Sequence, residues 1–253
     1  MLSENEARDA VIVALDCDRE RAIELADILS GTASWAKVGM TLFFREGPSI
    51  VRAMQDRGLS VFLDLKVFDI PFQVRGAVES ASLSGADILS IHALGSSAMV
   101  AAAREGAEAA AKERGGKRTQ LVSISVLTSM DQCSLEEIGI ERSLKEEVAR
   151  LASLAVGAGS DGIVCSPQEA SDMRALLGPD ALIVTPGVRP VGAAVGDQRR
   201  VATPASAIAA GASKLVVGRP ITQAEDPAAA MEAIVDELCH LQGFANAGVT
   251  CHS

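Results

Sequence analysis

Short apolar runs alternate with longer, alanine-rich amphipathic stretches along most of the chain. The run at residues 60–63 is rich in strand-forming side chains without apolar–polar alternation, which is typical of a strand covered on both faces. Read in this way, the short runs predict eight strands, over residues 10–16, 35–40, 60–66, 86–92, 121–127, 162–166, 182–186 and 214–218. Helices are predicted between them and after the last, over residues 19–30, 47–57, 72–84, 97–114, 143–157, 167–177, 203–211 and 227–242.

Proline and capping residues mark several of the predicted helix starts. Pro48, Pro167 and Pro204 stand at or near first helical positions, where the missing N–H of proline costs nothing. Asp226 precedes Pro227 as a cap followed by proline. These signals support the helix boundaries that the periodicity gives.

The order of the elements predicts the fold class. Regular repetition of strand and helix with short connections implies a parallel sheet, and eight uninterrupted units favour a closed (β/α)8 barrel. We therefore expect an α/β protein, a single TIM barrel over residues 1–253 with residues 243–253 as a surface tail. A doubly wound open sheet is the structural alternative.

Charged and polar residues concentrate where the predicted strands end. In a barrel of this kind, the loops after the strands converge on one mouth, and active sites lie there. The residues at these positions are Asp16, Lys37, Asp64, Lys66, Asp69, His92, Thr128 and Ser129, followed by the stretches "TPGVRP" at 185–190 and "GRPIT" at 218–222. The mouth is thus the predicted functional site.

The stretch "DLKVFDIP" at 64–71 is the densest of these positions. Asp64 and Lys66 are two residues apart on a strand and so share a face, and Asp69 follows where Ile70 and Pro71 end the strand. An ion pair at a strand end is the simpler interpretation of an isolated Asp-x-Lys. The second carboxylate favours a catalytic role.

Two glycine-containing segments near the end of the chain are candidates for binding phosphate. Gly218 would let a phosphate approach the backbone, and the guanidinium of Arg219 could hold two of its oxygens. The long glycine-rich loop at 186–200 adds Arg189 and Gln198. The alternatives are a turn with a solvated arginine and a plain surface loop.

His92 and Asp16 each have a plain structural explanation as well. His92 has no nearby His or Cys at a zinc-ligand spacing, so a neutral, hydrogen-bonded histidine is expected and no metal site is predicted. Asp16 could bind a sugar hydroxyl or a metal, or cap the helix that follows it.

Composition narrows the class of partner. The formal net charge is −10 and the Lys and Arg residues are scattered, so nucleic acid and anionic membrane surfaces are not expected partners. No apolar stretch reaches the roughly 18 residues of a membrane span, and the acidic start does not resemble a signal peptide. The five cysteines show no paired spacing, which favours a reducing cytoplasm over a disulfide framework.

The motifs at the predicted mouth resemble a known family. "FLDLKVFDIP" at 62–71 is similar to the Asp-x-Lys-x-x-Asp-Ile-Pro signature of the orotidine 5'-phosphate decarboxylase family. Further matching motifs occur in the family's order, namely "ALD" at 14–16, "KVGM" at 37–40, "VLTSM" at 126–130, "TPGVRP" at 185–190, "GDQRR" at 196–200 and "VGRPIT" at 217–222. The resemblance covers roughly residues 10–240.

This resemblance implies a homodimeric, cofactor-free and metal-free barrel that converts orotidine 5'-phosphate to UMP and carbon dioxide, the last step of de novo UMP synthesis. By similarity, Lys66 is the proton donor, Asp64 lies beside the substrate carboxylate, and Lys37 pairs with the charged groups and the ribose. Asp69 is expected to reach the active site of the neighbouring subunit. The substrate contacts implied in the same way are Asp16, Ile70, Gln73, Thr128, Ser129, Arg189, Gln198, Gly218 and Arg219.

The chain departs from the family pattern beside the second aspartate. Members of the family have His before that aspartate and Asn-Thr after the proline, where this chain has Phe68, Phe72 and Gln73. The threonine contacts the ligand in the family, so Gln73 would have to replace it with a longer polar side chain.

Two other functions remain open from the sequence. Magnesium-dependent sugar-phosphate decarboxylases and synthases of the same superfamily share the signature, but they resemble one another in an acidic ligand on the second strand, where this chain has Lys37. A non-catalytic nucleotide-binding barrel is the second alternative. It has no need to hold the carboxylates of Asp64 and Asp69 near an anionic ligand.

Overall fold

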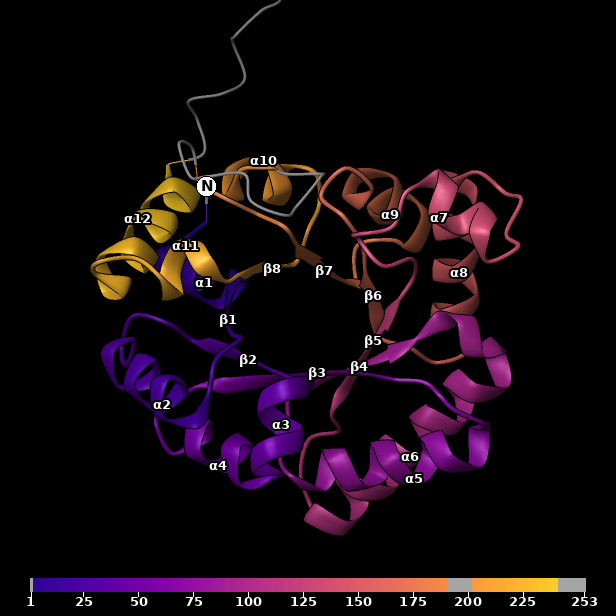
Figure 1. The fold of residues 1–253 in the computed structure, drawn as a ribbon, viewed down its shortest axis with the longest axis horizontal. Coiled ribbons are helices and arrows are strands. Elements are labelled where there is room, and N and C mark those ends of the chain that lie inside the picture. The colour runs from indigo at the N-terminus through magenta and orange to yellow at the C-terminus, as the bar shows by residue number, and fades with distance from the viewer. Residues whose placement is uncertain (1, 191–201, 241–253) are drawn as a thin grey trace, which may run out of the picture.

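The eight predicted strands form a closed parallel barrel in sequence order (Figure 1). The computed structural model describes residues 2–190 and 202–240. The strands are β1 (Val11–Leu15), β2 (Trp35–Gly39), β3 (Ser60–Val67), β4 (Ile88–His92), β5 (Gln120–Ile124), β6 (Gly162–Val164), β7 (Leu182–Pro186) and β8 (Lys214–Val217). Pairing of β8 with β1 closes the ring, so the barrel prediction is confirmed and the open-sheet alternative is wrong.

Helices surround the barrel and cover the outer face of the sheet (Figure 1). They are α1 (Glu4–Ala10), α2 (Arg19–Ile28), α3 (Met40–Glu46), α4 (Ser49–Gln55), α5 (Pro71–Leu83), η1 (Ala93–Gly95), α6 (Ser96–Arg114), α7 (Gln132–Glu137), α8 (Leu144–Gly157), α9 (Ala170–Leu177), α10 (Pro204–Ala209), α11 (Arg219–Thr222) and α12 (Pro227–Cys239). Every predicted helix is present, with ends shifted by a few residues. Pro204 and Pro227 open α10 and α12 as expected.

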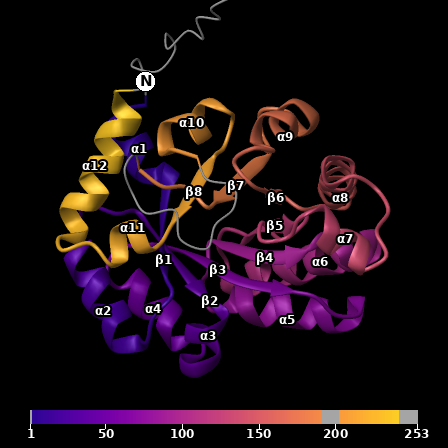
Figure 2. The same ribbon diagram turned by 45° about the horizontal axis from the view of Figure 1, so that its top comes forward.

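Five short helices were not predicted from the periodicity: α1, α3, η1, α7 and α11. Each has seven residues or fewer, so the apolar pattern has little length in which to repeat. The sequence did contain a local signal for α1, a capping box. The Ser3 hydroxyl oxygen accepts a hydrogen bond from the Glu6 N–H, and the Glu6 carboxylate accepts one from the Ser3 N–H. This helix lies beside α12 (Figures 1 and 2), and the Arg8 guanidinium is 2.8 Å from the Glu232 carboxylate.

Alternate residues of each strand face two different cores. Val11 and Val13 belong to the larger core between the sheet and the helices, whereas Ile12 and Ala14 face the barrel axis. The axial core also contains Trp35, Phe62, Ile88, Val122, Ile124, Val164, Val184 and Val216. A sheet buried on both faces explains why its strands read as continuous apolar runs.

A polar cluster closes the end of the barrel opposite the mouth. Lys214 Nζ donates to Asp9 Oδ2 at 2.7 Å and lies 4.3 Å from the centre of the Trp35 ring. Trp35 Nε1 donates to the other oxygen of the same carboxylate at 2.8 Å. Burial raises the pKa of Asp9, and the contacts with Lys214 and Trp35 outweigh it and leave that pKa lowered. Asp9 and Lys214 therefore neutralise each other at this end of the barrel, and we assign them a structural role.

None of the helices in the described ranges is long and apolar enough to cross a membrane. The predicted surface tail at 243–253 lies outside those ranges.

The close approach of α5 and α6 depends on one glycine. A Cβ added at Gly106 in α6 would lie 2.3 Å from the carbonyl oxygen of Arg75 in α5, whereas one added at Gly76 in α5 would meet nothing within 4 Å. Backbone atoms of a packed helix have little freedom to retreat, so only the first position requires glycine.

We expect Gly106→Ala to lower the free energy of unfolding by about 1–3 kcal/mol, the usual cost of overpacking. Gly76→Ala is the matched control and should be neutral or stabilise by up to about 1 kcal/mol, because alanine favours helix. Urea denaturation followed by circular dichroism measures both. Equal stability of Gly106→Ala and the parent would contradict the packing argument.

Candidate active site

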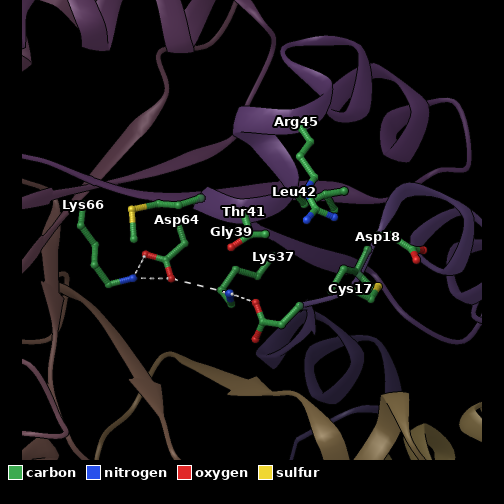
Figure 3. A pocket seen from close by; sticks show the side chains of 12 residues that line it. Cys17, Asp18, Lys37, Gly39, Thr41, Leu42, Arg45, Asp64 and Lys66 are labelled. Atoms are coloured by element: carbon green, nitrogen blue, oxygen red, sulfur yellow. Dashed lines mark hydrogen bonds and ion pairs between the residues drawn. The ribbon is translucent and has the colours of Figure 1, made fainter.

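Four charged side chains of alternating sign, Asp16, Lys37, Asp64 and Lys66, form a row across the mouth of the barrel. Figure 3 shows Lys37, Asp64 and Lys66 with the contacts between them as dashed lines. Lys37 Nζ donates to Asp16 Oδ1 at 2.8 Å and lies 3.7 Å from Asp64 Oδ2. Lys66 Nζ is 2.8 Å from each oxygen of Asp64. Three consecutive strands supply the row, since Asp16 follows β1, Lys37 lies in β2, and Asp64 and Lys66 lie in β3.

The carboxylate of Asp64 lies in the middle of this row, and its side chain is only 13% exposed. Burial raises its pKa, but the two ammonium groups of Lys37 and Lys66, with hydrogen bonds from Lys66 and Ser90, hold it below the ordinary value. The group is therefore an anion at neutral pH. It stands between two cations in a poorly hydrated place, where charge–charge interactions are stronger than in water.

The backbone of β3 is irregular at the same point. Leu63 pairs with Leu89 and Val67 with Ile91, so β3 has three residues between these pairs where β4 has one. Lys66 has a φ of 51°, in the left-handed region that costs a residue with a side chain about 1 kcal/mol or more. Such bulges are common beside active sites, where they redirect a side chain.

Gly39, at the end of β2, leaves room for one ion pair of the row. A Cβ at this position would lie 3.2 Å from both Asp16 Oδ1 and Lys37 Nζ. A larger residue would therefore press on the contact that these two atoms make.

Three adjoining cavities open around the row, and Lys37 lines all of them. The first, of about 460 Å³, is lined by Asp16, Asp64 and Lys66 together with Cys17, Asp18 and Arg45. The second, of about 160 Å³, is mainly apolar and is lined by Phe62, Ile124, Val126, Leu127, Thr128, Val164, Pro186 and Val216. The third, of about 390 Å³, is lined by Asp16, Arg189, Gly218 and Arg219.

Most of the residues predicted from the sequence lie in these cavities. Thr128 lines the apolar one, but its neighbour Ser129 is exposed and lines none of the three. Arg189, Gly218 and Arg219 come together although about 30 residues separate them along the chain. Gln198 lies outside the described residues.

Asp69, Ile70 and Gln73 stand apart from the row. All three are exposed, and the Asp69 carboxylate accepts a hydrogen bond from the Ile70 amide at 2.6 Å. Among the ion pairs of the described residues, none joins Asp69 to a lysine of its own chain. Asp69, the second aspartate of the signature, therefore does not join the charged row of its own chain.

His92 lies at the end of β4 with the environment expected for a neutral histidine. Its Nδ1 accepts a hydrogen bond from the Leu94 amide at 3.4 Å, and its ring centre is 5.5 Å from that of Phe68. Burial, and next the charge of Lys66, lower its pKa.

Several residues in or beside the site were not predicted from the sequence. Arg45 lies in a helix too short to predict, and the walls of the apolar cavity come from strands read only as core. Ser90 carries no local signal either, although it contacts both Asp64 and the Lys66 backbone. Its position as an inward-facing residue of β4 would have been the available clue, since Ile88 and His92 flank it at a spacing of two.

Comparison with known proteins gives a consistent result. The family model for the orotidine 5'-phosphate decarboxylase / HUMPS family matches residues 9–234. The chain is 50% identical over 229 residues to the orotidine 5'-phosphate decarboxylase of Halorhodospira halophila, covering 90% of this chain and 95% of that one. It is 48% identical over 227 residues to the enzyme of that name from Anaeromyxobacter sp. (strain K), covering 89% and 96%.

A solved structure agrees with these sequence matches. The crystal structure of orotidine 5'-phosphate decarboxylase from Lactobacillus acidophilus superimposes with a TM-score of 0.81 at 37% identity, covering 90% of this chain and 98% of that one. The chain belongs to the orotidine 5'-phosphate decarboxylase / HUMPS family.

Proposed function

We propose that this protein decarboxylates orotidine 5'-phosphate to UMP and carbon dioxide, the last step of de novo UMP synthesis. The observation that carries the proposal is the row Asp16–Lys37–Asp64–Lys66, which places an ammonium group beside a largely buried carboxylate at the mouth of a barrel of this family. Relatives that are about half identical over nine-tenths of the chain bear the name of this enzyme.

The three cavities suit the three parts of the substrate. The apolar cavity would receive the pyrimidine, with Thr128 at its wall. Asp16 and Lys37 would hold the ribose hydroxyls. The cavity with Arg189, Gly218 and Arg219 would bind the phosphate, because guanidinium groups match phosphate oxygens in charge and geometry.

Lys66 is proposed as the group that makes the reaction possible. When the bond from C6 to the carboxylate breaks, carbon dioxide leaves and its electron pair stays on C6. An ammonium group already in place stabilises that developing charge, and Lys66 Nζ then transfers a proton to C6 as general acid. The neutral amine regains a proton from solvent.

Asp64 has two roles in this proposal. Its charge attracts the ammonium group of Lys66, from which it is 2.8 Å away, and so holds that group in place. It would also lie beside the substrate carboxylate and disfavour the bound ground state, an effect relieved as carbon dioxide departs. Binding energy from the distant phosphate would compensate for placing these anions together.

A magnesium-dependent reaction of the same superfamily fits the site less well. Lys37 occupies the second-strand position, and its ammonium group contacts both Asp16 and Asp64. A divalent cation between those carboxylates would have to displace or repel it. No metal or organic cofactor takes part in the proposed reaction.

We further propose that the active enzyme is a homodimer. Phe68, Ile70 and Phe72 lie near Asp69 along the segment after β3, and these three residues are 58%, 63% and 80% exposed. A second copy covering this segment would remove apolar surface from water. It would also bring Asp69, and with it Ile70 and Gln73, to the neighbouring active site.

The proposed setting is the cytoplasm. Cys17, Cys133 and Cys239 are present as thiols, which suits a reducing compartment. The formal net charge of −10 disfavours binding to nucleic acid.

Lys66→Ala should abolish UMP formation while leaving UMP binding measurable, because the phosphate and ribose contacts come from other strands. The absorbance change of orotidine 5'-phosphate reports turnover, and calorimetry reports binding. Lys112→Ala, in an exposed position of α6, is the matched control and should retain parental activity. Turnover by Lys66→Ala would contradict the role of Lys66.

Exhaustive chelation should leave the rate unchanged, since the proposed reaction uses charges of the protein alone. The same absorbance assay, run before and after treatment with chelator, measures this. A loss of activity that magnesium restores would favour the metal-dependent alternative.

Mixing Lys66→Ala chains with Asp69→Ala chains should recover activity if each site takes Asp69 from the partner. Random assortment of the two inactive chains gives about half mixed dimers, and each of these contains one intact site. The recovered rate is measured after dissociation and reassociation. Two inactive parents that stay inactive when mixed would show that Asp69 acts within its own chain.

A further inference from the structure

The hydroxyl group of Ser90 links the two reactive residues of the charged row. The Lys66 backbone N–H donates to Ser90 Oγ at 2.8 Å, and Ser90 Oγ in turn donates to Asp64 Oδ1 at 2.8 Å. Ser90 is fully buried in β4. One side chain thus contacts the backbone of the proposed proton donor and the carboxylate that lies beside it.

The direction of these hydrogen bonds is fixed by their chemistry. A backbone N–H can only donate, so the Ser90 oxygen accepts from Lys66 and its own proton must point elsewhere. The atom it faces is a carboxylate oxygen, which accepts when ionised. The hydroxyl therefore stabilises the anionic form of Asp64.

The bulge in β3 explains why a side chain is needed at this place. Between Leu63 and Val67 the chain adds residues that have no partner across β4, where only Ser90 lies between the paired Leu89 and Ile91. The Lys66 amide consequently bonds to the Ser90 side chain instead of to a backbone carbonyl of β4. Without this acceptor, a left-handed residue at 66 would lose the contact that holds it.

We infer that Ser90 is a positioning residue for the reaction: it holds the bulged backbone of Lys66 and orients Asp64, so that the ammonium group stands in place before substrate binds. Ser90 lines none of the three cavities at the mouth and acts through its neighbours. The kinetic test of this inference rests on the proposed function. The positions of Lys66 and Asp64 can be tested without any assumption about the reaction.

The kinetic test compares Ser90→Ala with Ser90→Thr and Ser123→Ala. Ser90→Ala removes both hydrogen bonds and should lower kcat by about 10- to 100-fold, as loss of a supporting contact does, with KM within about twofold of the parent. Ser90→Thr keeps the hydroxyl and should recover most of kcat. The substrate affinity of the variants should match that of the parent, because neither substitution changes the residues that contact the phosphate and the ribose.

Ser123→Ala is the matched control. Ser123 is equally buried on the adjacent strand β5, but its hydroxyl donates to Ser160 and contacts no member of the row. Ser123→Ala should lower the free energy of unfolding without lowering kcat. Equal losses of kcat in Ser90→Ala and Ser123→Ala, or a Ser90→Ala enzyme with parental kcat, would overturn the inference.

A ligand-free crystal structure of Ser90→Ala provides a second readout that does not depend on turnover. We expect the Lys66 backbone to leave its positive φ or the Lys66 ammonium to move away from Asp64. An unchanged arrangement would overturn the inference. If Ser90→Ala does not fold, Ser90→Cys keeps nearly the same shape with a weak donor, and the same two measurements apply to it.

The outcomes separate this inference from the proposed function. A parent protein without decarboxylase activity would contradict the function, and the crystal structure would still test Ser90. An active parent with an equally active Ser90→Ala variant would contradict the role of Ser90 alone.

Discussion

The ionised carboxylate of Asp64 is the constraint on which the mouth of this barrel depends. A buried anion is costly unless cations and hydrogen-bond donors surround it. Lys37, Lys66 and Ser90 supply these contacts from three neighbouring strands. Because each contact also fixes the position of its partner, the anion organises the cations that the proposed chemistry requires.

The rest of the barrel supports the strands that carry this charged row. Its opposite end is closed by Asp9, Trp35 and Lys214, and its middle is filled by an apolar axial core. These layers hold the strands in register, so the ends of β1, β2 and β3 present their charges at one level. The register shift between β3 and β4 lies between Leu63 and Val67, near the end of β3.

The proposed catalysis depends on charged groups that are already in position before the substrate binds. The ion pairs exist before any substrate is bound, so little reorganisation is needed when charge develops in the transition state. The departures from the family pattern at Phe68, Phe72 and Gln73 lie in the exposed segment around Asp69 and not in the row. We therefore relate them to the proposed contact between subunits, where apolar side chains gain most from being covered.

The sequence by itself determined the eight strands and their order along the chain, because strands buried on both faces give apolar runs that proline and capping residues separate. It favoured a closed barrel, and the pairing of β8 with β1 in the structure excluded the open sheet. It also determined that Asp16, Lys37, Asp64 and Lys66 share one mouth. Only the tertiary structure decided what each of them contacts. The pairing of Lys37 with two carboxylates, the separation of Asp69 from its own chain's row, and the role of Ser90 opposite a bulge all depend on register between strands. The pairing of individual residues between parallel strands is not readable from either strand alone, since a helix separates the partners along the chain and packing between distant residues aligns them.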